Sequence, residues 1–370
     1  MDWLDELATL LRPAGGGIHT VSTGRAAQEQ LQRTLYGAGD MTEVRANFRD
    51  QLSRIPAAKG VVLGIPSDVG AGFVRGANFG PQVIRAALLE ATPDWPQRAA
   101  AASIIDIGDV FVVPQLLHDD MLSDAQKQAT RAALYPDVEP AVRDRLPVSP
   151  LSIAERVFDL IFAHNPRVAP FVIGGDHSTA WPVVAALARA RRDRWAILQP
   201  DAHTDLLESR LGVKYCFATW SYHANDLLGR DGRLVQVGTR ASGRDRTHWE
   251  STLGVRQFWA RECLDHPART LDAIVAHLRE VGADAVYLSN DIDGTDEAHG
   301  DATGTPEPGG LDPEWMVELI RRVGAEVGLL GGDIMEVAPP LEIPRGLGRT
   351  TRLAARYLRE TMAATLQIAL

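Results

Sequence analysis

From residue 60 onward, short apolar runs alternate with segments in which apolar residues recur at helical spacing. The apolar runs are VVLGIPSD (61–68), SIIDIGDV (103–110), PFVIGGDH (170–177), WAILQPDAH (195–203), RLVQVGTR (233–240), VRQFWARE (255–262), AVYLSNDID (285–293) and VGLLGGDIMEV (327–337). The segments between them predict helices at 80–91, 151–164, 178–192, 268–281, 312–324 and 349–367. Val, Ile and Leu runs that alternate with helices indicate an α/β protein with a parallel sheet covered on both faces. Eight strands fit a doubly wound open sheet or a TIM barrel, and both folds place the active site at the C-terminal strand ends.

Residues 1–59 precede this alternation and form an N-terminal helical extension. Apolar residues between Trp3 and Leu11 recur at helical spacing, Pro13 and the glycines that follow it end that helix, and a second helix is expected over 26–35. Because short amphipathic helices bury one face, we expect them to pack on the main domain, residues 60–370, or on a neighbouring subunit. The proline-rich segment 111–150 is expected to be a loop-and-helix excursion at the surface.

Composition narrows the class of protein. The chain has 370 residues, of which 45% are hydrophobic and 23% charged, as is usual for a globular protein. The net charge of −10 disfavours a nucleic-acid-binding surface, and two cysteines cannot form a disulfide framework. No apolar run approaches the ~20 residues that span a bilayer, and the first residues lack the positive charge of a signal peptide. We therefore expect a soluble cytoplasmic protein that binds neither nucleic acid nor membrane.

Acidic residues and histidines gather where three of the apolar runs end. The segments are GGDHS (174–178), DAHTD (201–205) and NDIDGTD (290–296). In an extended strand, residues i and i+2 point to the same side, so Asp201, His203 and Asp205 can share one face, as can Asp291 and Asp293. The candidate ligand set is His177, Asp201, His203, Asp205, Asp291 and Asp293.

Such a set is favourable when it holds cations. Several carboxylates in one pocket repel each other, and a divalent cation removes that cost. Two imidazoles and four carboxylates suit Mn, Ni, Co, Fe or Zn better than Mg or Ca. Six ligands exceed what one ion with an open position needs, so two ions about 3.5–4 Å apart that share carboxylates fit better. Taken alone, each residue also has a structural explanation; Asp176, for example, stands where a helix N-cap is expected.

With these motifs in their order and spacing, the chain resembles the ureohydrolase superfamily, which comprises arginases, agmatinases and related guanidino hydrolases. Four further segments within residues 60–365 carry the same likeness: RGANFGP (75–81) with Arg85, DIGDV (106–110), ATGTPEPGGL (302–311) and GGDIMEVAPP (331–340). The resemblance implies an arginase-like, three-layer α/β/α fold with an open eight-stranded parallel sheet rather than a barrel. It also implies assembly into homotrimers or homohexamers.

Carried over by position, the resemblance implies that one metal is held by His177, Asp201, Asp205 and Asp291, and the other by Asp201, His203, Asp291 and Asp293. Glu336 corresponds to the carboxylate that pairs with the substrate guanidinium, and Asp205 to the residue that orients the attacking water and moves its proton. The implied reaction cleaves a C–N bond of a cationic guanidino compound to give urea, or a substituted urea, and ammonia or an amine. The implied cofactors are two divalent ions per chain, Ni²⁺ or Mn²⁺.

The segment KYCFATW (214–220) departs from the family pattern, in which a histidine lies over the site. Thr219 is kept, whereas Cys216 and Phe217 stand where that histidine is expected. Phe217, Thr219 and Trp220 are therefore candidate substrate-binding residues, and the two aromatic residues are equally expected in the core. These departures, the long N-terminal extension and the segment TWSYHANDLLGRDGR (219–233) resemble the guanidine hydrolase branch, whose members act on free guanidine and use nickel. A small cation without a tail needs a tight pocket, which Phe217 and Trp220 would help to close.

Other functions stay open at the level of sequence. An agmatinase, a guanidino-acid hydrolase and one subunit of a heteromeric biguanide (metformin) hydrolase belong to the same superfamily. A deacetylase of related architecture uses a single zinc ion, which leaves the second-metal residues His203 and Asp293 unexplained. A non-catalytic subunit is expected to lose ligands, whereas all six positions are filled here.

Overall fold

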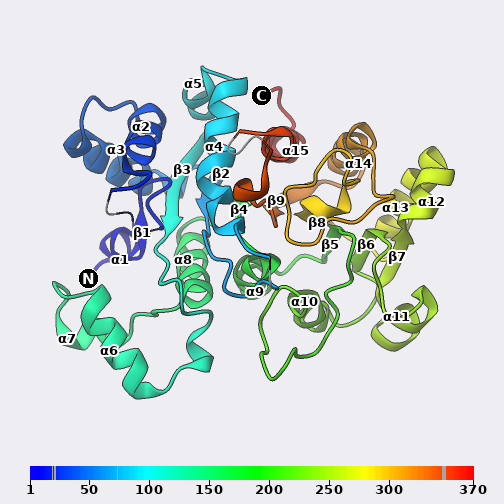
Figure 1. The fold of residues 1–370 in the computed structure, drawn as a ribbon, viewed down its shortest axis with the longest axis horizontal. Helices are drawn as coiled ribbons and strands as arrows, with labels where there is room; N and C mark the ends of the chain where they lie inside the picture. The colour runs from blue at the N-terminus through cyan, green and yellow to red at the C-terminus, as the bar shows by residue number, and fades with distance from the viewer. Residues whose placement is uncertain (19, 21, 73, 344–346) are drawn as a thin grey trace.

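A nine-stranded sheet forms the centre of the protein. The computed structural model describes residues 1–18, 20, 22–72, 74–343 and 347–370 (Figure 1). The strands are β1 (Leu11–Arg12), β2 (Gly60–Gly64), β3 (Ile104–Val110), β4 (Ala169–Ile173), β5 (Trp195–Pro200), β6 (Leu234–Thr239), β7 (Arg256–Trp259), β8 (Ala285–Asp291) and β9 (Leu329–Met335). They follow one another in the order β1-β3-β2-β4-β9-β8-β5-β6-β7, which Figure 1 shows as a row across the molecule. The sheet is open, with β1 and β7 at its edges, so the fold is a three-layer α/β/α arrangement and not a barrel.

All eight predicted strands are present and pair in parallel. The ninth strand, β1, was not predicted; its two residues pair antiparallel with the end of β3, Leu11 opposite Val110 and Arg12 opposite Asp109. A two-residue strand has no periodicity of its own and forms only because the neighbouring strand offers an edge. The parallel strands are almost completely buried, as expected for a sheet with helices on both faces.

Helices cover both faces of the sheet. They are α1 (Trp3–Leu10), α2 (Arg25–Tyr36), α3 (Met41–Ser53), α4 (Gly80–Ala91), α5 (Trp95–Ala101), α6 (Asp124–Leu134), α7 (Pro140–Arg143), α8 (Pro150–His164), α9 (Trp181–Ala190), α10 (Trp220–Leu228), α11 (Arg246–Leu253), α12 (Ala260–Asp265), α13 (Pro267–Glu280), α14 (Pro313–Glu326) and α15 (Arg349–Leu366). In one layer, α4, α15, α14 and α13 lie in this order, and each helix packs against the next. The other layer contains α8, α9 and α10. The six predicted helices are all present, with ends that differ by up to three residues.

The N-terminal segment packs on the main domain. Helix α1 contacts α8, and α2 contacts α4, so this segment extends both helical layers at one end of the sheet (Figure 1). Leu7, Leu10 and Val44 are fully buried in the common hydrophobic core. The hydroxyl of Tyr36 accepts a hydrogen bond from Ala14 N at 3.0 Å. The segment 111–150 holds α6 and α7 and projects from the body of the molecule, as its prolines predicted.

The strand order determines where the functional side chains meet. The four strands β4, β9, β8 and β5 are neighbours at the middle of the sheet, and each predicted motif follows one of their C-terminal ends. Because all four strands are parallel, these ends lie on the same edge of the sheet. Within the described residues, no helix has the length and apolar character needed to cross a lipid bilayer.

Candidate metal centre

The GGDHS turn places His177 at the end of β4. The short helix η4 (His177–Ala180) begins there, and Asp176 caps it by accepting a hydrogen bond from Ser178 N at 2.9 Å. Gly175 is required for close approach, since a Cβ at this position would lie 1.7 Å from Ser67 O. Backbone crowding, rather than phosphate binding, therefore explains this glycine.

Three carboxylates surround His177. Its Nδ1 atom lies 3.0 Å from Asp291 Oδ2, 3.3 Å from Asp201 Oδ2 and 3.4 Å from Asp205 Oδ2. All four side chains are buried, and the atoms of His177, Asp201 and Asp205 are close enough to hold one metal ion together. Asp205 reaches this position with a left-handed backbone, φ +52°, which turns its carboxylate back toward Asp201.

A second group adjoins the first. His203 Nδ1 lies 3.0 Å from Asp293 Oδ2 and 3.7 Å from Asp201 Oδ1, and these three residues again offer atoms within reach of one ion. Asp201 thus belongs to both groups, with one oxygen facing each histidine. Asp291 lies between them, because its Oδ2 faces His177 while its Oδ1 accepts a hydrogen bond from Asp293 N at 2.9 Å. The structure therefore brings all six candidate ligands together, in two groups that share a carboxylate.

The pKa shifts of these groups reflect their mutual repulsion and burial. Burial and the neighbouring carboxylate of Asp201 raise the pKa of Asp205 well above its usual value. Burial and the charge of Asp293 do the same to the pKa of Asp291. Burial alone would lower the pKa of His203, but Asp293, Asp201 and Asp205 outweigh it and raise the pKa to about 11. The raised pKa values follow from burial and from the excess negative charge of the cluster, which divalent cations held by the same donors would compensate.

Glu336 follows β9 and contacts the backbone of His177. Its backbone is left-handed, φ +62°, and its Oε1 accepts a hydrogen bond from His177 N at 2.9 Å. Burial and the carboxylate of Asp176 raise the pKa of Glu336 well above its usual value. Among the described residues, no lysine or arginine side chain forms an ion pair with Glu336. A buried carboxylate without its own cation is suited to receive one from a substrate.

Several supporting residues were not predicted as part of the site. Ser289, on β8, contacts His177 Nε2 at 3.1 Å and donates its hydroxyl to Asp333 at 3.0 Å. Burial raises the pKa of Asp333 to about 6, although the charge of His177 opposes that change. Such contacts fix which ring nitrogen of a histidine faces a metal ion. The only sequence signal for them is a polar residue within an apolar strand, which is not specific.

The three candidate substrate residues lie in different surroundings. Trp220 is fully buried; its ring stacks on His177 with centroids 4.5 Å apart, and its Nε1 donates to Asp205 Oδ2 at 3.0 Å. Thr219 Oγ1 accepts from Cys216 N at 2.8 Å and closes the 214–219 turn. Phe217 is partly exposed, and the guanidinium of Arg210 lies 4.8 Å from the centre of its ring. Trp220 therefore contacts candidate metal ligands, Thr219 holds the turn, and Phe217 lies at the surface.

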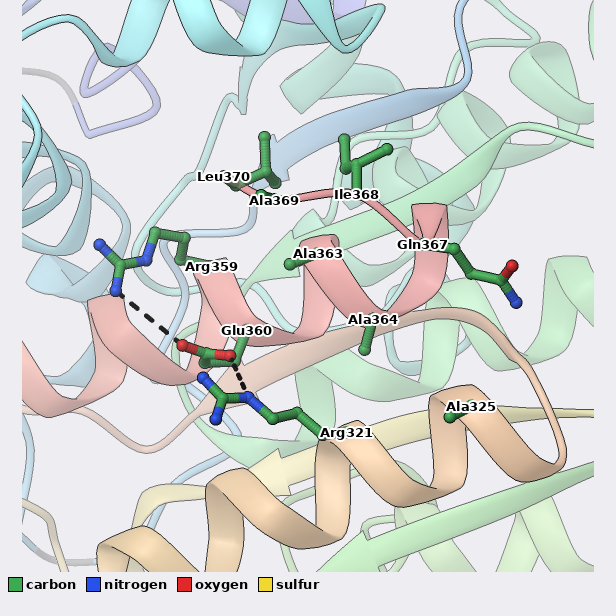
Figure 2. Close-up of a pocket in the computed structure, with 10 residues that line it drawn as sticks. All are labelled: Arg321, Ala325, Arg359, Glu360, Ala363, Ala364, Gln367, Ile368, Ala369 and Leu370. Atoms are coloured by element: carbon green, nitrogen blue, oxygen red, sulfur yellow. Dashed lines mark hydrogen bonds and ion pairs between the residues drawn. The ribbon is translucent and has the colours of Figure 1, made fainter.

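A groove at the C-terminal helix has different chemistry. It has a volume of about 690 Å³ and lies between α14 and α15 (Figure 2). Its acidic residue, Glu360, is already paired with Arg321 at 3.0 Å and with Arg359 at 3.9 Å, as Figure 2 shows. The rest of its lining is mostly alanine and aliphatic side chains. This groove offers no group of metal ligands, so the edge at β4, β9, β8 and β5 is the candidate functional site.

Comparisons with known proteins agree with this geometry. The model of the Arginase family matches residues 58–364. Guanidinobutyrase from Pseudomonas aeruginosa is 31% identical over 333 residues, covering 88% of this chain and 92% of that protein. The human mitochondrial guanidino acid hydrolase is 28% identical, covering 82% of this chain and 77% of that protein. The structure of proclavaminate amidino hydrolase from Streptomyces clavuligerus superposes with a TM-score of 0.63 at 26% identity, covering 84% of this chain and 93% of that one. The chain therefore belongs to the Arginase family and is a ureohydrolase, an enzyme that acts on C–N bonds of guanidino compounds.

Proposed function

We propose that this enzyme hydrolyses free guanidine to urea and ammonium with two divalent ions, Ni²⁺ or Mn²⁺, held by the six ligands described above. The observation that carries the proposal is Glu336, a buried carboxylate beside His177 that has no cationic partner in the described chain. A planar guanidinium matches a carboxylate through two parallel hydrogen bonds. Glu336 would therefore hold the substrate next to the two ligand groups.

The chemistry divides between the cofactor and the chain. When bound, a pair of divalent ions supplies water that is deprotonated near neutral pH and stabilises developing negative charge. Glu336 orients the substrate carbon toward that water. Asp205 takes up the proton of the attacking water and delivers it to the leaving nitrogen. The water oxygen forms the new bond to carbon, one C–N bond breaks, and urea and ammonium are released.

The space around Glu336 favours a substrate without a tail. A Cβ at Gly304 would lie 3.0 Å from Val74 O and 3.9 Å from Glu336 Oε2, so these backbones pass close above the carboxylate. Trp220 is fully buried against His177 and Asp205, so it occupies space beside these candidate ligands. Guanidine itself needs little more room than the side-chain head of an arginine, whereas a longer substrate needs additional space for its tail.

A guanidino-acid hydrolase is the second candidate, and one observation favours it. Phe217 and Arg210 line a cavity of about 560 Å³ whose other walls are mostly apolar, including Val69 and Leu117. An alkyl tail ending in a carboxylate would fit such walls, with Arg210 as its partner. The relative from Pseudomonas aeruginosa is named a guanidinobutyrase. An agmatinase would instead place a terminal ammonium beside Arg210, which is electrostatically unfavourable.

A panel of guanidino substrates separates these candidates. Metal-free protein is reconstituted separately with Mn²⁺ and Ni²⁺, and urea and ammonium are measured with guanidine, 4-guanidinobutyrate, agmatine and arginine. Guanidine yields one ammonium per urea, whereas the other three yield urea and an alkylamine. We expect the highest kcat/KM for guanidine and about two metal ions per chain. A preference for 4-guanidinobutyrate that Arg210→Ala abolishes would establish the second candidate instead.

The assembly is a separate proposal. We expect a cytoplasmic homotrimer or homohexamer, and light scattering of the purified chain measures its mass. A chain that binds metal and hydrolyses nothing until a paralogous subunit is added would instead be one part of a heteromeric biguanide hydrolase.

A further inference from the structure

Three glutamines form a continuous row beside the candidate metal centre. Gln199 on β5 is in register with Gln236 on β6, which is in register with Gln257 on β7. All three are fully buried, 0% exposed. Neighbouring strands are about 4.8 Å apart, which is the spacing at which in-register amide side chains hydrogen-bond to one another.

The row is directional. Trp259 Nε1 donates to Gln257 Oε1 at 2.9 Å, Gln257 Nε2 to Gln236 Oε1 at 2.8 Å, and Gln236 Nε2 to Gln199 Oε1 at 2.9 Å. Gln199 Nε2 then donates to Asp201 Oδ2 at 2.7 Å. An indole N–H only donates and an ionised carboxylate only accepts, so the two ends determine the orientation of every amide between them. Reversing any one amide would break two of these hydrogen bonds.

Two further contacts tie the row to the rest of the site. Gln236 Nε2 also donates to Thr204 O at 2.5 Å, within the loop that carries the ligands from Asp201 to Asp205. Ser221 on α10, next to Trp220, donates its hydroxyl to Gln199 Oε1 at 2.7 Å. The row thus joins β5, β6, β7, the ligand loop and α10.

The row ends at Asp201, whose two carboxylate oxygens face different histidines of the candidate metal centre. Its Oδ2 faces His177 Nδ1 at 3.3 Å, while its Oδ1 accepts from His203 N at 2.7 Å. With one hydrogen bond on each oxygen, the plane of this carboxylate is fixed, and each oxygen keeps a lone pair for an ion. Asp201 is the residue that both ligand groups share.

We propose that Gln199, supported by Gln236, is a positioning residue that orients the shared carboxylate of Asp201 and thereby sets the affinity of both metal positions. This inference rests on the metal centre of the proposed function and extends it to residues outside the ligand set. Outer-shell hydrogen bonds of this kind contribute about 10- to 100-fold to metal affinity.

The test compares Gln199→Met with Gln257→Met in the full chain. Methionine conserves the volume of glutamine and removes its hydrogen bonds, and the two sites are equally buried and belong to the same row. The affinity for Mn²⁺, and separately for Ni²⁺, is measured by competition with a chelator, and thermal unfolding is measured on metal-free protein. We expect similar losses of thermal stability in the two variants. Metal affinity should fall about 10- to 100-fold in Gln199→Met and less than threefold in Gln257→Met.

Equal losses of affinity in the two variants would overturn the inference, as would wild-type affinity in a folded Gln199→Met. If Gln199→Met does not fold, Gln236→Met serves in its place, since it cuts the same row one link further from Asp201, and the same comparison applies. Wild-type protein that binds two ions yet hydrolyses no guanidino compound would refute the proposed function alone, because the affinity comparison needs no substrate.

Discussion

Two clusters of mostly buried carboxylates lie in this protein, and their negative charge is compensated in different ways. In the first, Arg85 on α4 is 1% exposed and pairs with two residues of β3, the partly exposed Asp106 and the buried Asp109. In the second, four aspartates and Glu336 gather at the ends of β5, β8 and β9 around two histidines. The first cluster contains its own cation, whereas no lysine or arginine side chain pairs with the acidic groups of the second within the described residues.

The Arg85 cluster shows what a satisfied guanidinium requires in this fold. Its five N–H groups have five acceptors: both oxygens of Asp106 at 2.7 and 3.0 Å, Asp109 Oδ1 at 2.5 Å, and the carbonyls of Gly108 and Pro81 at 2.9 and 3.4 Å. Burial would lower the pKa of Arg85, but Asp106 and Asp109 outweigh it and raise the pKa. Glu336 offers the same carboxylate without the guanidinium. Under the proposed function, the negative charge of this second cluster is compensated by divalent ions and by a substrate guanidinium rather than by a side chain of the described residues.

Removing a carboxylate from each cluster gives the largest expected contrast. Asp201→Asn takes away the ligand that both groups share, so metal affinity should fall by more than about 100-fold and guanidino hydrolysis should be lost, since even outer-shell changes cost about 10- to 100-fold. Asp106→Asn removes a carboxylate of the first cluster and should reduce thermal stability while metal affinity and kcat are retained. Metal titration and steady-state kinetics of both variants measure this contrast. Retained metal affinity in Asp201→Asn would show that the two clusters do not differ as described.

Replacing the internal cation tests the other half of the comparison. Arg85→Met leaves Asp109 buried without its cationic partner, and breaking a buried ion pair in this way costs about 3–5 kcal/mol of unfolding free energy. Denaturant unfolding of the metal-loaded enzyme measures the loss. Addition of Mn²⁺ should not restore the stability of this variant, because Asp106 and Asp109 do not belong to either group of candidate metal ligands in the described part of the chain. Restoration by metal would contradict the distinction between the clusters.

Glu336→Gln separates substrate binding from metal binding within the second cluster. The amide keeps the volume and an oxygen to accept the His177 N–H, but it lacks the charge that pairs with a guanidinium. We expect kcat/KM to fall about 10²- to 10³-fold, the usual cost of a single group that stabilises charge in the transition state. The metal content should stay near the wild-type value, as measured by elemental analysis. Loss of metal together with activity would assign Glu336 to the ligand set instead.

The sequence predicted the parts of this site that follow from strand order. His177, Asp201 and Asp291 each stand at or just after the end of an apolar run, and parallel strands bring such ends to one edge of a sheet. The eight parallel strands were predicted for the same reason, because strands buried on both faces have distinctive apolar runs. The metal identity and the substrate are not encoded in these patterns, and both stay predictions.

The residues that hydrogen-bond to the candidate ligands could not be predicted from the sequence. Their contacts depend on the register between strands, which brings side chains of different strands opposite one another. Gln199 and Gln236 appear in the sequence as isolated polar residues within apolar runs, and only the register of β5, β6 and β7 shows that they form a row. Helix α10 was likewise not predicted, and with it the contacts of Trp220, for which the sequence left the substrate pocket and the core equally open. In the structure Trp220 contacts His177 and Asp205.

Substitution of Trp220 has the smallest expected effect of these tests. It also has a matched control, because a second tryptophan of the chain makes a comparable hydrogen bond to a carboxylate outside the ligand set. Trp220 Nε1 donates to Asp205 Oδ2 at 3.0 Å, and Trp181 Nε1 donates to Glu155 Oε1 at 2.9 Å in a neighbouring aromatic cluster. Trp220→Phe and Trp181→Phe each keep an aromatic ring and lose one indole hydrogen bond to a carboxylate. Only the first carboxylate belongs to the ligand set, so metal affinity should fall about tenfold in Trp220→Phe and stay near wild type in Trp181→Phe. Chelator competition measures both values, and equal affinities in the two variants would mean that the indole fills space beside His177 without orienting Asp205.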